Sequence, residues 1–325
     1  MVNNTNRYML NLCSIIFSAT LIGDNQKLVT MTKTVSICIF ARNEAKLLPR
    51  CVSALQASSG DLPWHAHILV NGCTDDTLEV AHALGAAESR LTIHSLPVGD
   101  KANAWNDYVF RIADADYGAH IFLDGDIVPS EDAIDALWLG LHKNPDAFGA
   151  SALPATGRSR RSWATRLYEN HYLSGNLYAL SGNVIKEFRN RNLTLPIGAK
   201  GEDGLITYLL LTDLNGGRDD QHTHRIIHAD NASFEFDSIG LNLQDLKIYI
   251  RRLRRYSERH FQKEILYRIL KEQGVSAMPE NIDTIYTPDA VKDLKPRLDL
   301  INFMFDQETL KRLRSTKAGP KAAAL

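Results

Sequence analysis

Two aspartates one residue apart, Asp124 and Asp126, follow the short apolar run Ala119–Leu123. A run of this length, with Pro-Ser-Glu at 129–131 opening a helix just after, is typical of a buried strand in a parallel sheet. In open α/β sheets, ligands bind beyond the carboxyl ends of the strands. Two carboxylates at such a position suit a hard divalent cation, Mn²⁺ or Mg²⁺, and a phosphate that the cation holds. Asp124 and Asp126 are therefore our candidate metal ligands.

The residues around this pair alternate between strand and helix patterns, which predicts a doubly wound α/β sheet. We expect strands at 35–41, 67–71, 91–95, 119–124 and 147–153, and helices at 44–58, 74–84, 102–113 and from 130. Gly85 is expected to close the second helix in a left-handed conformation. The second half is less regular, with strands predicted at 177–182 and 225–236 and a helix at 202–214.

From residue 243 the pattern becomes helical, and a further short helix is expected at about 298–313. The predicted organisation has an N-terminal extension at 1–30, a main α/β domain at 31–240 and a C-terminal helical extension at 241–315. Residues 316–325, rich in Ala, Lys and Gly, are expected to be a disordered tail. The fold class is thus α/β, a Rossmann-type, mostly parallel sheet flanked by helices, with a helical extension.

The amino-acid composition limits the classes of function that this chain can have. The 325 residues carry a formal net charge of −1, which gives no reason to expect nucleic-acid binding. Four cysteines without a C-x-x-C spacing indicate reduced thiols and a cytoplasmic location. The apolar stretch 8–23 is too short to span a bilayer comfortably, and no transmembrane helix is predicted. It is an unstructured extension, or it follows an upstream start codon and Met31 is the natural first residue. We favour these two interpretations over a weak signal peptide.

Four stretches, in this order, resemble the nucleotide-sugar glycosyltransferases of family 2, which have the GT-A fold. Val35-Ser-Ile-Cys-Ile-Phe-Ala-Arg-Asn-Glu44 resembles the family's first strand and Asn-Glu turn. Leu69-Val-Asn-Gly-Cys-Thr-Asp-Asp-Thr77 resembles its second-strand loop, although Val70 stands where the family usually has an Asp. Gly99-Asp-Lys-Ala-Asn-Ala-Trp-Asn106 resembles its G-K-x-x-A-x-N helix start, with one extra residue between Gly and Lys. Asp124-Gly-Asp126 takes the place of its D-x-D.

Two later stretches extend the resemblance to about residue 260. Gly201-Glu-Asp203 resembles the motif that carries the catalytic base. Arg251-Arg-Leu-Arg-Arg-Tyr256 resembles the family's Q-x-x-R-W motif, but no Gln precedes Arg254 or Arg255 at the family spacing.

The resemblance implies a GT-A-like fold, a nucleoside-diphosphate-sugar donor and a divalent cation, and it assigns site residues. The nucleotide sugar would contact Phe40, Ala41, Arg42, Asn43, Glu44, Asn71, Lys101, Asp124, Arg254 and Arg255. Asn71 would pair with a base edge, because an amide both donates and accepts. Lys101 would neutralise phosphate or hold Asp126 in place. Asp203 would be the general base, because an acceptor hydroxyl near its ordinary pKa is a poor nucleophile, and Glu202 would orient the site.

The helix expected at 246–274 is strongly basic, with nine Lys and Arg residues. It is an ordinary solvated helix, a clamp for the donor diphosphate through Arg254 or Arg255, or a surface attracted to an anionic membrane that bears a lipid-linked acceptor. The last option would place a cytoplasmic protein at the inner face of the membrane.

Together these features predict an inverting, metal-dependent glycosyltransferase that makes a polysaccharide, glycolipid or other glycoconjugate. Two alternatives remain open at this point. A sugar-phosphate nucleotidyltransferase would carry a Gly-rich loop after the first strand, and residues 40–44 contain no glycine. A non-catalytic nucleotide-sugar-binding module is disfavoured by Asp124, Asp126 and Asp203.

Overall fold

The computed structural model describes residues 33–114, 116–217, 221–237 and 243–315. The predicted N-terminal extension at 1–30 and the predicted disordered tail at 316–325 lie outside these residues. Among the described helices, none combines the length and the apolar character needed to cross a bilayer.

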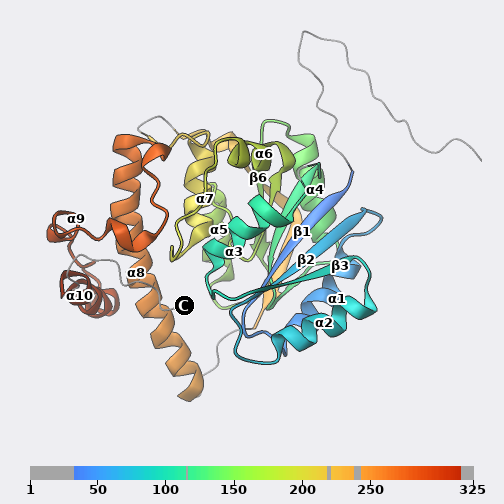
Figure 1. The fold of residues 1–325 in the computed structure, drawn as a ribbon, viewed down its shortest axis with the longest axis horizontal. Helices are drawn as coiled ribbons and strands as arrows, with labels where there is room; N and C mark the ends of the chain where they lie inside the picture. Colours follow the sequence, from blue (N-terminus) through green and yellow to red (C-terminus); the bar gives the residue numbers. More distant parts are fainter. Residues whose placement is uncertain (1–32, 115, 218–220, 238–242, 316–325) are drawn as a thin grey trace, which may run out of the picture. The chain divides into compact units, whose positions relative to one another are not determined.

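One mixed sheet organises the chain (Figure 1). Its strand order is β3-β2-β1-β4-β7-β6-β8-β5, and four of the seven pairings between described strands are parallel. The parallel half comprises β1 to β4, whereas β7 runs antiparallel to both β4 and β6. The strands are β1 Val35–Ala41, β2 Trp64–Asn71, β3 Leu91–Leu96, β4 Ala119–Asp124, β5 Ile127–Pro129, β6 Gly149–Pro154, β7 Leu177–Ser181 and β8 Ile226–Phe236.

Helices cover both faces of the sheet, which explains why β1 is apolar at nearly every position. Successive side chains of a strand point to opposite faces. Val35, Ile37 and Ile39 therefore belong to one core cluster, with α1 Leu48–Ser58, α2 Thr77–Ala87 and α4 Ala133–Lys143. Cys38 and Phe40 belong to the other, with α3 Lys101–Asp107, α6 Gly182–Asn190, α7 Glu202–Leu211 and α8 Leu243–Gln273. The remaining helices are α5 Arg160–Glu169, α9 Pro288–Lys292 and α10 Leu300–Ser315.

The two aspartates lie on either side of a sharp change of direction. Asp124 ends β4 in the middle of the sheet, and only Gly125 and Asp126 separate it from β5 at the sheet's edge. The Gly125 N–H donates to the carbonyl oxygen of Phe40 at 2.8 Å. A Cβ at Gly125 would lie 3.1 Å from that same oxygen, so glycine permits the close approach. Asp124 is thereby fixed beside the carboxyl end of β1.

Two local predictions were wrong. Gly85 does not end its helix, because α2 continues to Ala87. Its role is packing: a Cβ there would meet the Ile93 side chain of β3 at 3.2 Å. The helix expected at 102–113 changes character after Asp107, and Tyr108–Ile112 form a π-helical turn.

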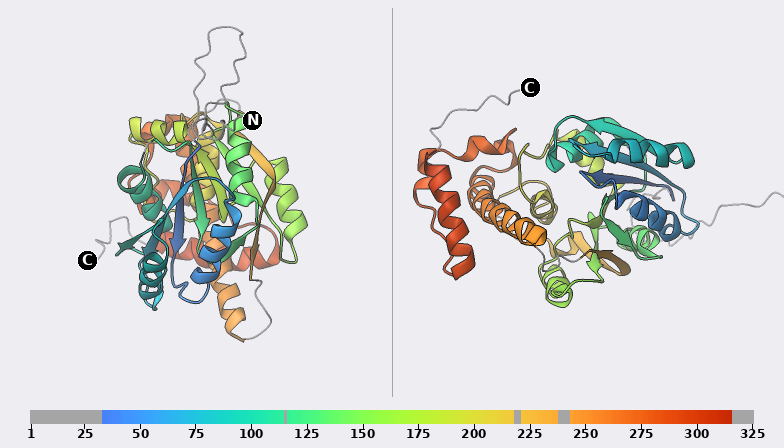
Figure 2. Two further views of the ribbon diagram at one scale, coloured as in Figure 1. Left: turned by 90° about the vertical axis from the view of Figure 1, so that its right-hand side faces the viewer. Right: turned by 90° about the horizontal axis from the view of Figure 1, so that it is seen from below.

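The C-terminal helices lie to one side of the sheet, with α10 against α8 (Figures 1 and 2). Phe261 and Ile265 bury α8 in the same cluster as Phe40. The segment before α10 is fixed by Arg297, whose guanidinium lies 2.7 Å from the fully buried carboxylate of Asp306. The pKa of Asp306 is lowered, because hydrogen bonds from Arg297 and Ser257 outweigh the opposing effect of burial.

We expect Asp306→Asn to lower the free energy of unfolding by about 2 kcal/mol at neutral pH, because a charge-assisted contact of a buried group is lost. A carboxyl with a lowered folded-state pKa contributes its full stability above the unfolded pKa, about 4. That contribution is lost as the pH falls through the folded-state pKa. Urea unfolding should therefore show the gap between wild type and variant closing below about pH 4. The control is Glu272→Gln, an exposed site on α8, and an equal loss in both variants would contradict the assignment.

Candidate functional site

Lys101 connects the carboxylates that the sequence singled out. It begins α3 immediately after Asp100, whose side chain caps the helix by accepting from the Asn103 N–H at 2.8 Å. The Lys101 Nζ lies 2.5 Å from Asp124 Oδ1 and 3.1 Å from Glu202 Oε1. It also donates to the carbonyl oxygen of Gly175 at 3.0 Å. The expectation that Lys101 contacts Asp126 is thus replaced by a bridge between β4 and α7.

Burial and charge perturb all three groups of this bridge. Burial raises the pKa of Asp124 to about 7, with Lys101 opposing the shift and Asp126 adding to it. Burial would lower the pKa of Lys101, but Asp124 and Glu202 outweigh it and raise that pKa. The pKa of Glu202 is lowered, because Lys101 outweighs the effect of burial. Lys101 is therefore held as a cation between two carboxyl groups.

Asp203 is held by a second cation, one that the sequence did not single out. The Arg259 guanidinium of α8 lies 3.2 Å from Asp203 Oδ1 and 3.3 Å from Oδ2. It passes directly over Gly201, where φ is +80° and a Cβ would overlap the guanidinium. On its other side, Asp203 contacts Gly175. The i+4 spacing from Arg255 was the only sequence signal, and nothing in the sequence indicated which helix face would meet Asp203.

The loop after β1 is tied to the loop after β2. Phe40 is buried, with the Lys101 Nζ 5.1 Å from its ring centre, and Ala41 completes β1. The Asn43 Oδ1 accepts from the Thr74 N–H at 2.8 Å, and the Glu44 N–H donates to Thr77 Oγ1 at 2.8 Å. These contacts fix the candidate nucleoside-binding segment 40–44 before any ligand arrives.

Contacts of Asn71 and Arg42 connect these loops to the start of α3. The buried Asn71 Oδ1 accepts from the Asp100 N–H at 3.1 Å, so one of the two amide atoms expected to read a base edge is already engaged. The exposed Arg42 donates to the carbonyl oxygen of Gly99 at 2.6 Å. Gly72, with φ +57°, lies so close to the Gly99 backbone that no side chain fits between them.

Asp126 differs from its neighbour in having no partner. It is partly exposed and makes no hydrogen bond or ion pair with any residue that the structure describes. The pKa of Glu44 is raised to about 8 by burial and by the charges of Asp126, Asp124 and Asp75, in that order. This end of the sheet therefore carries more negative charge than Lys101 neutralises. Within the described ranges, no three or more His, Cys, Asp or Glu side chains are grouped so as to hold a metal ion by themselves.

The two arginines expected to clamp a diphosphate, Arg254 and Arg255, have different neighbours in the structure. Arg254 lies 3.0 Å from Glu308 and faces α10, with 59% of its side chain exposed. Arg255 is one turn before Arg259 and close enough to Glu202 to help lower the pKa of that carboxyl. The structure therefore brings Arg255, and not Arg254, toward the carboxylates.

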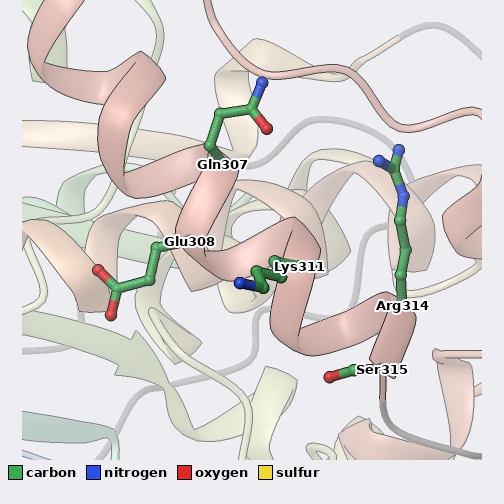
Figure 3. Close-up of a pocket in the computed structure, with 5 residues that line it drawn as sticks. All are labelled: Gln307, Glu308, Lys311, Arg314 and Ser315. Atoms are coloured by element: carbon green, nitrogen blue, oxygen red, sulfur yellow. The ribbon is translucent and has the colours of Figure 1, made fainter.

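A shallow surface hollow at the end of α10 involves none of these residues. Figure 3 shows its lining, Gln307, Glu308, Lys311, Arg314 and Ser315. Another hollow lies between the loops after β2 and β3 and is lined by Val70, Gly72, Asp75, Ser95 and Pro97 among others. The second hollow adjoins the segment 40–44 through the Ala45–Asp75 contact of 3.4 Å.

Comparison with solved structures identifies the architecture. A mannosyltransferase from Pyrobaculum calidifontis, in complex with GDP-Man and Mn²⁺, shares 16% identity with a TM-score of 0.53, covering 88% of this chain and 76% of that one. Glucosyl-3-phosphoglycerate synthase from Mycobacterium tuberculosis, in complex with Mn²⁺, UDP and phosphoglyceric acid, shares 19% identity with a TM-score of 0.49, covering 70% and 78%. No curated protein matches the chain.

The sequence itself carries the stronger finding. Residues 36–200, about half of the chain, match the family model described as Glycosyl transferase family 2. This range contains the segment 40–44, Asn71, Lys101 and both aspartates of the Asp124-Gly-Asp126 turn. The chain therefore belongs to glycosyl transferase family 2 and has the GT-A-like fold of its nucleotide-sugar glycosyltransferases.

Proposed function

We propose that this glycosyltransferase moves a sugar from a nucleoside-diphosphate sugar to a hydroxyl group, with inversion at the anomeric carbon and with a divalent cation bound. The observation that carries the proposal is the Lys101 bridge. It brings Asp124, at the end of β4, to Glu202 and Asp203, at the start of α7, in one connected site. The matched family agrees with this chemistry, as do the GDP-Man and Mn²⁺ in the complex of the similar mannosyltransferase.

The carboxylates fit a cation that shares its coordination with the donor. Asp126 offers a carboxylate that has no hydrogen bond or ion pair with the described residues. Asp124 keeps acceptor capacity beyond its bonds to Lys101 and Asn176. Oxygen ligands suit Mg²⁺ and Mn²⁺, and such ions commonly take only one or two carboxylates alongside substrate phosphates and water. Asp126 and Asp124 would hold the ion. When bound, it would act as a Lewis acid on the leaving diphosphate, a contribution of several kcal/mol.

The donor would be held by residues from three loops. The segment Phe40–Glu44 and Asn71 would contact the nucleoside, because both lie at the carboxyl ends of adjacent parallel strands. Arg255 is our candidate for the diphosphate, since a guanidinium matches phosphate oxygens and its own side chain has no partner among the described residues.

Asp203 would be the general base. Inversion in one step requires removal of the acceptor hydroxyl proton as the new bond forms, which is worth about 100- to 10,000-fold in rate. Arg259 holds both oxygens of the carboxylate at 3.2–3.3 Å, and it would fix their direction. Glu202, bonded to Lys101, would orient α7 and not exchange a proton itself. The acceptor would be a glycan, a glycolipid or another hydroxyl compound.

Peripheral contact with an anionic membrane is a separate proposal, supported by the C-terminal surface. Leu298, Leu300 and Met304 are 96%, 77% and 64% exposed, which is unusual for adjoining apolar side chains. Residues 246–315 contain fifteen Lys and Arg against ten Asp and Glu, although the whole chain has a net charge of −1. Apolar side chains flanked by cations suit the surface of an anionic bilayer.

The first test identifies the nucleotide. UDP, GDP, dTDP and CMP are each added with Mn²⁺, and the melting temperature is measured. We expect one of them to stabilise the protein in a Mn²⁺-dependent way, because a ligand that binds only the folded state raises its stability. Asp126→Ala should abolish the Mn²⁺-dependent part, whereas Glu131→Ala, at an exposed neighbouring site, should not. An undiminished Mn²⁺ effect in Asp126→Ala would remove the metal assignment.

A second test addresses the base. Asp203→Asn keeps the shape of the side chain and an oxygen that can accept from Arg259. We expect turnover of the donor, by transfer or by hydrolysis, to fall about 100- to 10,000-fold while nucleotide affinity is retained. The exposed Asp135→Asn of α4 serves as the control. Unchanged turnover in Asp203→Asn would exclude this residue as the base.

The membrane proposal is tested by flotation with phosphatidylglycerol–phosphatidylcholine vesicles. Bound protein should decrease as salt is added, because exposed charges are screened. The double variant Leu300→Ser, Met304→Ser should float less than wild type, and Tyr168→Ser, a 61% exposed residue of α5, should float as wild type does. Equal flotation on pure phosphatidylcholine vesicles would argue against an anionic surface.

A further inference from the structure

Lys263 lies one turn after Arg259 on α8 and has no acidic partner. Its Nζ lies 5.2 Å from the ring centre of Tyr267 and 5.7 Å from that of Tyr172. It forms no ion pair with any carboxylate in the part of the chain that the structure describes. Burial and the charge of Arg259 lower its pKa, and Asp203 opposes them. An ammonium group with free donors thus lies within the electrostatic reach of the proposed base.

Of the two rings beside Lys263, that of Tyr267 is held in place by contacts of its own. The Tyr267 hydroxyl donates to the carbonyl oxygen of Gly204 at 2.6 Å, and its ring stacks on Tyr208 with centres 4.4 Å apart. Tyr172 is 39% exposed, and its carbonyl oxygen lies 3.3 Å from His228 Nε2. The Tyr267 ring does not need the ammonium group to fix its position. Lys263 is therefore available to a ligand.

This surface adjoins Asp203, whose charge acts on both Lys263 and Tyr267. Gly175, three residues after Tyr172, contacts the Asp203 carboxyl group. Gly204, next to Asp203 in α7, accepts the Tyr267 hydroxyl. Lys263 and its two neighbouring rings are therefore connected to the base through Gly175 and Gly204. Asp124 and the bridge through Lys101 lie on the Glu202 side of the same helix start.

The charges on this surface indicate that its ligand would be an anion. Arg259 is already paired with Asp203, so their charges offset each other, and Lys263 is left as the uncompensated group. A cation with unused donors binds a carboxylate or phosphate more strongly than a neutral hydroxyl, because charge-assisted hydrogen bonds are about twice as strong as neutral ones. The exposed ring of Tyr172 beside it offers the flat apolar contact that the face of a sugar requires.

We propose that Lys263, with Tyr172 and Tyr267, forms an acceptor subsite that binds an anionic group, a carboxylate or a phosphate, on the acceptor. This contact would place the attacking hydroxyl beside Asp203. The inference rests on the proposed function, and it adds to it the chemical class of the acceptor: a sugar acid, a sugar phosphate or a phosphate-linked glycan carrier.

The test compares matched sugars that differ only in charge. Glucuronate, glucose 6-phosphate and neutral glucose are titrated by ligand-observed NMR, with and without a nucleoside diphosphate and Mg²⁺ to fill the donor site. In wild type we expect both anions to bind and glucose to bind more weakly. In Lys263→Gln the anion affinity should fall about tenfold, as expected for loss of a charge-assisted contact. Lys263→Arg should keep most of it.

Lys271→Gln is the matched control, because Lys271 is exposed on the same helix two turns further on. Its anion affinity should equal that of wild type. The melting temperature of each variant confirms that it is folded. Equal anion affinity in wild type and Lys263→Gln, or wild-type binding of glucose as tight as that of the two anions, would overturn the proposal.

Two further measurements distinguish a failure of this proposal from a failure of the proposed function. Nucleotide affinity should be unchanged in Lys263→Gln, because the subsite is not part of the donor site. If no nucleotide binds wild type, the proposed function fails, and the titration without nucleotide still judges the subsite. Phosphatidylglycerol vesicles distinguish the source of the anion: binding lowered by Lys263→Gln indicates a lipid-linked phosphate, and binding of the sugar anions alone indicates a soluble acceptor.

Discussion

The contact of Lys101 with Asp124 and Glu202 is the interaction on which the site depends. Two carboxyl groups and one ammonium group share a largely buried position, and the lysine lowers the pKa of each carboxyl group against the effect of burial. Removing one member of such a set leaves an uncompensated buried charge, which costs about 3–5 kcal/mol when burial is complete. The start of α3, the end of β4 and the start of α7 are thereby held together by one side chain.

The same logic extends to the C-terminal helices. Arg259 reaches Asp203 from α8, and α8 is buried in the cluster that contains Phe40. The helical extension therefore contributes to the candidate site. Its inner face carries Arg255, Arg259 and Lys263 at spacings of four residues, so a row of cations follows the helix past the two acidic residues of α7. Donor phosphate, base and acceptor anion would be met in turn along this row.

The sequence predicted the strand ends well, because buried parallel strands are short apolar runs that stop at polar residues. The fold class and the position of Asp124 at the end of β4 followed from that pattern, whereas the family followed from the resemblance of the motifs. The pattern did not predict which side chains contact one another. Lys101 contacts Asp124 and Glu202 and not Asp126, and Arg259 holds Asp203, because both contacts depend on how α7 and α8 pack against the sheet. Gly85 shows the same limit. A glycine stands there because a side chain of β3 lies close by, and not because a helix ends.

The short turn from β4 to β5 has a consequence for how the site is assembled. Asp124 is fixed by strands that are complete once the chain reaches Ser181, but β5, which follows Asp126, pairs only with β8, about one hundred residues later in the chain. Contacts between residues so far apart in sequence form late, because loop closure must precede them. The two candidate ligands of one ion are thus placed at different stages of folding. As the chain emerges from the ribosome, Asp124 can reach its final position early, whereas Asp126 can do so only after β8 has been made.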